Sequence, residues 1–163
     1  MRLPIKILLI PFHLVRHFLP TEEDTNKVIE ILADEFSWLN KKQALVFMGH
    51  GTTHFSNSIY AALDYAFKDK GHPNIFLATV EAYPSIDSLK RLVDAYKPEE
   101  IVLAPFMIVA GDHAKNDMAG DDPDSWYNKF KAAGYKVTPI LKGLGEYRGI
   151  QELFVEHLKT IEQ

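Results

Sequence analysis

Two histidines and one glutamate recur at nearly equal intervals along the chain. His50 precedes Glu81 by 31 residues, and Glu81 precedes His113 by 32 residues. Each interval is close to the length of one strand–helix unit, so we expect the three residues at equivalent positions of a repeating α/β structure. If they converge, two imidazoles and one carboxylate form an open metal site, because three protein ligands leave coordination positions free for another molecule.

The elements that would position these residues alternate along the chain. Continuous apolar runs predict buried parallel strands at residues 5–10, 44–48, 74–80 and 100–105, with a weaker strand at 136–141. Apolar residues at helical spacing predict helices near residues 21–36, 55–70, 85–97, 123–133 and 150–161. This alternation predicts an α/β fold with three layers, an open parallel sheet covered by helices on both faces, in one domain over residues 1–163.

Local signals refine the helices and single out one connection. Thr21 and Asp24 form a candidate capping pair, and Ser85 is a candidate cap for the third helix. Leu92 and Leu158 belong to the predicted apolar stripes of the third and last helices. The connection over residues 106–122 is long and rich in Asp, His, Asn and Gly. Long connections inside compact domains are usually functional, so we expect part of the site there.

Composition excludes several classes of function. The formal net charge of -4 gives no long-range attraction for nucleic acid or anionic lipid. The chain has no cysteine, so a metal must be bound by His and carboxylate groups. The apolar stretch over residues 5–15 is too short to span a bilayer and is interrupted by Pro11 and His13. We therefore expect no partner in nucleic acid or membrane, and a cytoplasmic location.

The remaining histidines have more ordinary interpretations. His54 is either a fourth ligand or a helix cap, and we favour a position on a helix face near the site. His13 and His17 follow the first predicted strand and could reach the cleft, although an ordinary loop role is favoured. His72 and His157 have the pattern of turn and helix-surface residues.

Two glycines, Gly49 and Gly51, flank His50 and would let a ligand approach the backbone closely. The segment nevertheless lacks the Lys-Ser/Thr of a P-loop and the G-x-G-x-x-G fingerprint of dinucleotide-binding folds. No serine occurs in a G-x-S-x-G setting. Nucleotide binding and covalent acyl transfer therefore have no support.

Four motifs carry a family resemblance. They are VFMGHGT at 46–52, TVEAYP at 79–84, VAGDHAKNDMAG at 109–120 with DSW at 124–126, and GLGE at 143–146. Together they resemble the class II chelatases, and most closely the anaerobic cobalt chelatases (CbiK type) that insert Co²⁺ into sirohydrochlorin. The resemblance places the metal ligands of that family at His50, Glu81 and His113. Members usually have two α/β halves around the macrocycle, and this chain resembles the second half.

The resemblance implies insertion of a divalent metal ion into a tetrapyrrole, with Co²⁺ expected and Ni²⁺ or Fe²⁺ as alternatives. His50 and His113 would bind and present the ion, and Glu81 would balance its charge. His50 would then accept a pyrrole proton. The other wall of the cleft would come from a second copy of the chain in a homo-oligomer or from a missing first half.

Residues around the three ligands receive supporting roles. The residues expected to contact substrate are Gly49, Gly51, Thr52, His54 and Lys115. Asp112, Asn116 and Asp117 either hold the ligand imidazoles or cap the following helix. Lys142 and Arg148 are further candidate partners for the carboxylates of sirohydrochlorin.

Two other kinds of function use the same three ligands. A metal-assisted hydrolase or a non-haem iron oxygenase would need the same open positions on the metal. A non-catalytic carrier of haem or metal is a different class, because half of a cleft can hold a ligand without transforming it.

Overall fold

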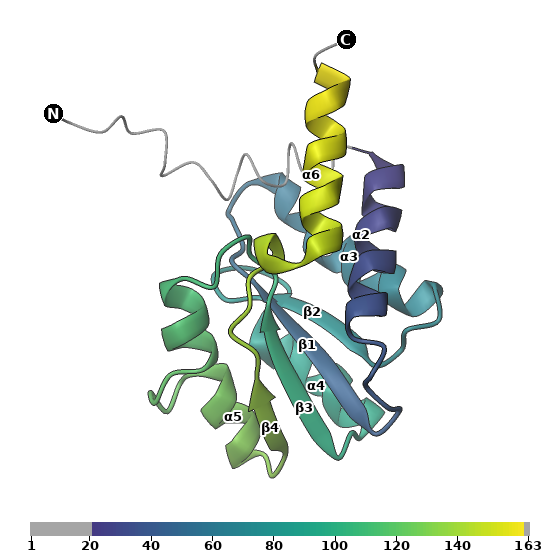
Figure 1. Cartoon of the computed structure of the whole chain (residues 1–163). Helices are drawn as coiled ribbons and strands as arrows, with labels where there is room; N and C mark the ends of the chain where they lie inside the picture. The colour runs from purple at the N-terminus through teal and green to yellow at the C-terminus, as the bar shows by residue number, and fades with distance from the viewer. Residues whose placement is uncertain (1–20, 162–163) are drawn as a thin grey trace, which may run out of the picture.

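The computed structural model describes residues 21–161, in which parallel strands alternate with helices (Figure 1). The strands are β1 (Gln43–Gly49), β2 (Ile75–Thr79), β3 (Glu100–Pro105) and β4 (Lys136–Pro139). The longer helices are α2 (Glu22–Glu35), α3 (Ser58–Asp69), α4 (Ile86–Tyr96), α5 (Trp126–Ala132) and α6 (Arg148–Ile161). Short helical segments are η2 (Phe55–Asn57), η3 (Ala114–Met118) and η4 (Leu144–Glu146). The strand predicted at residues 5–10, together with His13 and His17, lies outside the described residues.

The sheet has the strand order β2-β1-β3-β4, and every neighbouring pair is parallel. β1 is therefore flanked by β2 and β3. The register pairs Gly49 with Thr79 and Met48 with Pro105, so the carboxyl ends of these three strands lie at one edge of the sheet. In open α/β sheets, ligands bind at the loops that leave this edge.

Alternate residues of the inner strands face opposite helical layers. Along β1, Leu45 and Phe47 belong to the core formed with α2, α3 and α6. Ala44, Val46 and Met48 belong to the core formed with α4, α5 and η3. Helices cover both faces, which is why the strand sequences are continuously apolar instead of alternating. The predicted α/β fold with three layers is confirmed.

The edge strand β2 is covered by two charged side chains of α3. The N–H of Leu77 donates to the carboxylate of Asp64 at 2.8 Å, and the ammonium of Lys68 donates to the carbonyl oxygen of Ile75 at 3.0 Å. Lys68 and Asp64 also pair with each other at 2.7 Å. These contacts occupy backbone groups to which another strand could otherwise bind.

Helix boundaries follow the capping signals. Thr21 caps α2 and Ser85 caps α4, each by accepting a backbone N–H with its side-chain oxygen, as predicted. The fourth helix begins at Trp126 instead of near residue 123, because Ser125 is its N-cap. The connection over residues 106–122 is also more ordered than a simple loop, since it contains η3, whose Ala114 and Met118 are fully buried.

Two residues of the predicted apolar stripes are not buried. Leu92 is 49% exposed because it lies at the margin of the α4 face centred on Leu89 and Val93. Leu158 is 63% exposed, whereas the preceding residue His157 pairs with Asp24 of α2. Within residues 21–161, no helix combines the length and the apolar character needed to cross a membrane.

Candidate metal site

The three candidate ligands lie on the connections that follow three adjacent strands. His50 follows Gly49, the last residue of β1. Glu81 lies two residues after β2 ends at Thr79, and His113 directly precedes η3 in the connection after β3. Because β1 pairs with both β2 and β3, the sheet brings together three connections that are far apart in the sequence.

The side chains of His50, Glu81 and His113 converge at this edge. His50 Nδ1 lies 3.6 Å from Glu81 Oε2, and His113 Nε2 lies 4.0 Å from Glu81 Oε1. The two imidazole rings meet edge to face with their centroids 4.5 Å apart. One potential ligand atom from each residue lies within 4.8 Å of the other two, and no other such group of His, Asp and Glu occurs among residues 21–161.

These separations suit a cation that all three side chains share. Nitrogen and oxygen ligands at about 2.1 Å from a tetrahedral ion lie about 3.4 Å from each other, so a small adjustment would complete the coordination. The side chains of His50, His113 and Glu81 are 25%, 38% and 53% exposed. An ion held here would therefore remain accessible to a second molecule.

Hydrogen bonds orient both imidazoles. His113 Nδ1 lies 2.6 Å from Asp117 Oδ2, four residues later in the same helical segment. With the proton on Nδ1, this bond leaves the lone pair of Nε2 on the side of Glu81, the carboxylate–histidine arrangement found at many metal sites. His50 Nδ1 lies 2.9 Å from the carbonyl oxygen of Gly51 and 3.6 Å from Glu81 Oε2, so the loop backbone holds this ring beside the acid.

The backbone holds His50 and Glu81 side by side. The N–H of Glu81 donates to the carbonyl oxygen of His50 at 3.0 Å, so the pairing of β1 with β2 continues into the two loops. Gly51 has a φ of 90°, and a Cβ there would lie 3.0 Å from atoms of Thr79 and Ala82. A residue with a side chain would therefore be strained at this turn and would also push the two loops apart.

The connection that carries His113 is held by the loop after β4. The N–H of Gly145 donates to the carbonyl oxygen of Ile108 at 3.0 Å. A Cβ at Gly143 would lie 2.5 Å from that same oxygen, and the carboxylate of Glu146 accepts the N–H of Gly143 at 2.8 Å. These positioning contacts were not predicted from the sequence, where the two glycines entered only through the family resemblance. The sequence signal that could have indicated these contacts is the pair Gly143 and Gly145 followed by Glu146.

The other predicted residues after β1 stabilise the loop. The N–H of Thr52 donates to Asn57 Oδ1 at 3.0 Å, and the Asn57 amide donates to the carbonyl oxygen of Tyr83 in the loop after β2. His54 is exposed and caps η2 by accepting the N–H of Ser56. It lies outside the group of three ligand residues.

Of the three residues expected to support the imidazoles, the structure places one against a ligand. Asp117 contacts His113, as described above. Asp112 and Asn116 have exposed side chains, and neither forms a side-chain hydrogen bond with a ligand imidazole in the described part of the chain. Lys115 is exposed on η3, where an anionic group of a substrate could reach it.

Two further cations suggested by the sequence contact neighbouring side chains. Lys142 Nζ lies 3.9 Å from the ring centroid of Tyr147, and burial raises the pKa of that phenol to about 12, with Glu35 and Glu146 adding to the shift. Arg148 pairs with Glu152 at 2.8 Å on the exposed face of α6. Lys142 follows β4 at the carboxyl edge, whereas Arg148 begins α6.

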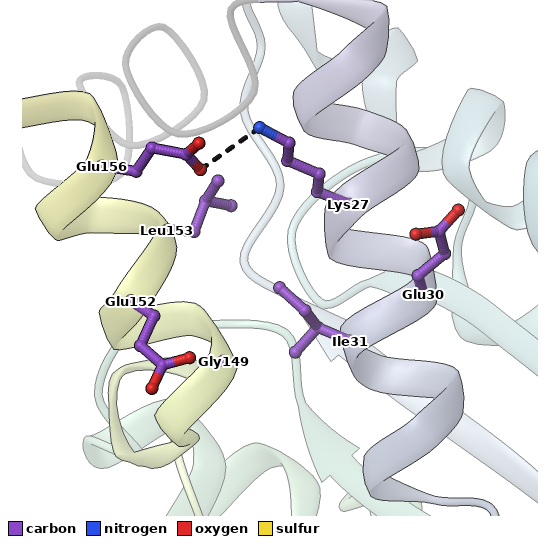
Figure 2. A pocket seen from close by; sticks show the side chains of 7 residues that line it. All are labelled: Lys27, Glu30, Ile31, Gly149, Glu152, Leu153 and Glu156. Atoms are coloured by element: carbon purple, nitrogen blue, oxygen red, sulfur yellow. Dashed lines mark hydrogen bonds and ion pairs between the residues drawn. The ribbon is translucent and has the colours of Figure 1, made fainter. Parts of the chain in front are cut away.

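A cavity between α2 and α6 contains none of the three ligands (Figure 2). Lys27 and Glu156 join the two helices across it at 3.2 Å. Close by in the sequence, His157 Nε2 pairs with Asp24 Oδ1 at 2.7 Å, and both side chains are largely buried. His157 was predicted to be a helix-surface residue. That interpretation is wrong, because the side of α6 that carries His157 packs against α2.

The chain is an α/β protein with helices on both faces of a parallel sheet, and two histidines and a glutamate at the carboxyl edge form a candidate open metal site. Residues 9–163 match the sequence pattern of the cobalt chelatase (CbiK) family, and the chain belongs to this family.

Two relatives agree with this assignment. The chain is 41% identical over 143 residues to a sirohydrochlorin cobaltochelatase from Salmonella typhimurium, covering 86% of this chain and 53% of the relative. It is 35% identical over 116 residues to sirohydrochlorin cobaltochelatase CbiKC from Nitratidesulfovibrio vulgaris, covering 71% of this chain and 41% of the relative. The matched part of this chain thus spans about half the length of these curated relatives.

A solved structure supports the fold. A cobalamin (vitamin B12) biosynthesis CbiX protein from Marinobacter aquaeolei VT8 superposes with a TM-score of 0.51 at 19% sequence identity. The match covers 72% of this chain and 98% of the CbiX chain. The sheet and helices of this chain therefore share the fold of nearly the whole CbiX chain.

Proposed function

We propose that this chain inserts Co²⁺ into sirohydrochlorin, with His50, Glu81 and His113 as the residues that bind and present the ion. The observation that carries the proposal is that one ligand atom from each of these residues lies within 4.8 Å of the others at the carboxyl edge of the sheet. Both relatives bear the name sirohydrochlorin cobaltochelatase, and the choice of Co²⁺ and sirohydrochlorin in this proposal follows from that name.

The proposed reaction exchanges one Co²⁺ ion for two pyrrole protons. The imidazoles of His50 and His113 replace water on the incoming ion, and Glu81 offsets part of its charge. Three protein ligands leave positions at which ring nitrogens can bind and then displace the protein groups one at a time. His50, once released from the ion, accepts a pyrrole proton, and the second proton passes to solvent through the exposed Glu81.

Asp117 acts through His113 in this scheme. Its carboxylate lies 2.6 Å from Nδ1 and so keeps the ring in the orientation that directs Nε2 toward Glu81. Ni²⁺ and Fe²⁺ are alternative metal substrates, because a set of two imidazoles and a carboxylate binds all three ions in an order set mainly by the metals themselves.

We further propose that residues 1–163 form one chelatase-like unit equivalent to the second half of a longer chelatase. A second copy of the chain or a separate first half would cover the side of the site that is now open. The exposure of all three ligands supports this arrangement. The cytoplasmic location expected from the sequence stays a prediction.

The test is a metal-insertion assay with Co²⁺ and sirohydrochlorin, followed by the absorbance change of the metallated macrocycle. We expect His113→Ala to lower the rate at least 100-fold, because one of three ligands is lost. His72→Ala is the matched control, since His72 lies in the turn between α3 and β2, and this variant should keep the wild-type rate. Equal rates for both variants would exclude the proposed site.

The same assay separates insertion from carriage. Retention of haem or Co²⁺ by the wild-type chain, without any metallation of sirohydrochlorin under these conditions, would contradict the proposal and favour a non-catalytic carrier. Because a second α/β half could be required, the wild-type measurement is repeated over a range of chain concentrations, and the mass in solution is determined by sedimentation at each one.

A further inference from the structure

The side chain of Asn57 joins the two loops that carry His50 and Glu81. Its amide oxygen accepts the N–H of Thr52 at 3.0 Å, and its amide N–H donates to the carbonyl oxygen of Tyr83. Thr52 lies two residues after His50, and Tyr83 lies two residues after Glu81. One carboxamide therefore connects equivalent positions of the loop after β1 and the loop after β2.

Two further contacts hold the same loops together closer to the candidate ligands. The N–H of Glu81 donates to the carbonyl oxygen of His50 at 3.0 Å. A Cβ at Gly51 would lie 3.0 Å from the backbone nitrogen of Ala82, so the next residues of the two loops also approach closely. The bridge through Asn57 continues this series of contacts. It is made by a side chain, so a substitution can remove it without changing the backbone.

Both ends of the bridge are anchored. The N–H of Asn57 donates to the carbonyl oxygen of His54 at 2.9 Å, and Asn57 directly precedes α3, which packs into the core through Tyr60. On the other side, the buried Thr79 donates its N–H and its hydroxyl to the carbonyl oxygen of Pro84 at 2.7 and 3.1 Å. The loop after β2 is thereby tied both to its own strand and to the start of α3.

Asn57 stands at the N-cap of α3, yet its side chain does not cap that helix. Asparagine is favoured at an N-cap because its side-chain oxygen usually accepts a backbone N–H of the first helical turn. Here the same oxygen accepts the N–H of Thr52, which lies outside the helix. The bridge also needs a donor and an acceptor in one planar group, which asparagine has, whereas aspartate can only accept and leucine can do neither. The side chain therefore serves the loops in place of the helix.

We propose that Asn57 is a positioning residue of the metal site, which holds the Glu81 carboxylate beside His50 by fixing the loop after β2. The distance it maintains is the 3.6 Å between His50 Nδ1 and Glu81 Oε2. This inference rests on the proposed function and extends it to a residue that is not itself a ligand. A metal ion binds more weakly when a ligand loop must first be ordered, because that ordering costs conformational entropy.

The test is a titration with Co²⁺ alone, followed by calorimetry and by the visible absorbance of the bound ion, which depends on its coordination geometry. Asn57→Leu should weaken Co²⁺ binding about 10-fold, as expected for loss of an outer partner of a metal ligand, and should change the absorbance. Asn74→Leu is the matched control, because the Asn74 amide donates to the carbonyl oxygen of Gln43 at 3.1 Å and so joins β1 and β2 at the opposite edge of the sheet. The control should keep the wild-type affinity and absorbance.

A Glu81→Ala background separates positioning of the carboxylate from general stabilisation of the fold. Adding Asn57→Leu to Glu81→Ala should weaken Co²⁺ binding less than twofold, because the group that Asn57 positions is then absent. A 10-fold loss in this background as well would overturn the inference, and so would wild-type affinity in the single variant. If Asn57→Leu does not fold, Asn57→Ala takes its place, since it removes the same two bonds without adding volume.

Failure of the proposed function has a different signature. Tight Co²⁺ binding by the wild-type chain, without metallation of sirohydrochlorin, would overturn the proposed function and leave the role of Asn57 to be decided by the two variants. Absence of Co²⁺ binding by the wild-type chain would overturn the proposed function and this inference together.

Discussion

Two regions of the molecule place a histidine against an aspartate at nearly the same distance. At the carboxyl edge of the sheet, His113 Nδ1 lies 2.6 Å from Asp117, and these side chains are 38% and 45% exposed. Between α2 and α6, His157 Nε2 lies 2.7 Å from Asp24, and these side chains are 20% and 9% exposed. The first pair has a second imidazole and Glu81 beside it, whereas the second pair joins two helices.

The difference shows that a histidine–carboxylate bond does not by itself indicate function. In the pair at the sheet edge, the nitrogen that does not face the aspartate lies 4.0 Å from Glu81, so the bond orients a candidate metal ligand. The pair between the helices belongs to no group of three possible ligand residues among residues 21–161. Because both side chains are largely buried, the bond is part of the packing between α2 and α6. Changes in the two pairs should therefore affect different measurements.

The largest effect is expected from Asp24→Ala. This change removes charged hydrogen bonds to Thr21 and His157 at a nearly buried position, and it should lower the free energy of unfolding by about 3 kcal/mol. The measurement is denaturant unfolding, with Asp34→Ala as control because Asp34 is an exposed carboxylate of the same helix. Co²⁺ affinity should not change. A loss of Co²⁺ binding in folded Asp24→Ala protein would contradict the conclusion that the Asp24–His157 pair only joins the two helices.

Asp117→Ala should have the reverse effect. Removing the partner of the His113 ring should weaken Co²⁺ binding about 30-fold, or about 2 kcal/mol, while the free energy of unfolding of the metal-free chain stays nearly constant. Calorimetric titration measures the affinity. Asp112→Ala makes the same change of charge next to His113 without removing a hydrogen bond to the ring, so it should bind Co²⁺ much more tightly than Asp117→Ala. Equal affinities of these two variants would contradict the role given to Asp117.

The smallest effect is a pH dependence confined to the pair between the helices. Burial alone would raise the pKa of Asp24, but the hydrogen bonds from Thr21 and His157 and the charge of His157 outweigh it, so the pKa lies below its usual value of 3.8. A carboxylate with a lowered pKa stabilises the fold above its unfolded pKa and loses this contribution as the pH falls through its folded pKa. The difference in stability between wild type and Asp24→Asn should therefore shrink as the pH falls from about 5 to about 3. A constant difference over this range would show that the Asp24 charge does not stabilise the helix pair.

Much of the site could be expected from the spacing of its residues. Intervals of 31 and 32 residues placed His50, Glu81 and His113 after successive strands, since a strand–helix unit has about that length. The intervals could not show that β1 lies between β2 and β3, on which the convergence depends. They also could not separate Asp117 from Asp112 and Asn116, because that choice depends on which side of one helical segment faces the imidazole.

Some errors have the same origin. His157, which lies between Glu156 and Leu158, was assigned to a helix surface, yet its ring pairs with Asp24 of α2, more than a hundred residues earlier in the chain. Leu158, the next residue, was assigned to the apolar stripe of the last helix and is 63% exposed. Hydrophobic periodicity identifies a helix and its apolar side, but it does not tell which residues of that helix a neighbouring helix covers.

The sequence by itself determined the strand and helix order, the layered α/β class and the three residue types able to bind a metal, because periodicity, capping and side-chain chemistry are local properties. Only the tertiary structure decided that the three side chains meet and that Gly143 and Gly145 hold the connection before His113. It also decided that one histidine–aspartate pair lies beside the candidate ligand group while the other joins two helices. These outcomes depend on which segments pack against each other, and residues distant in the sequence set that packing.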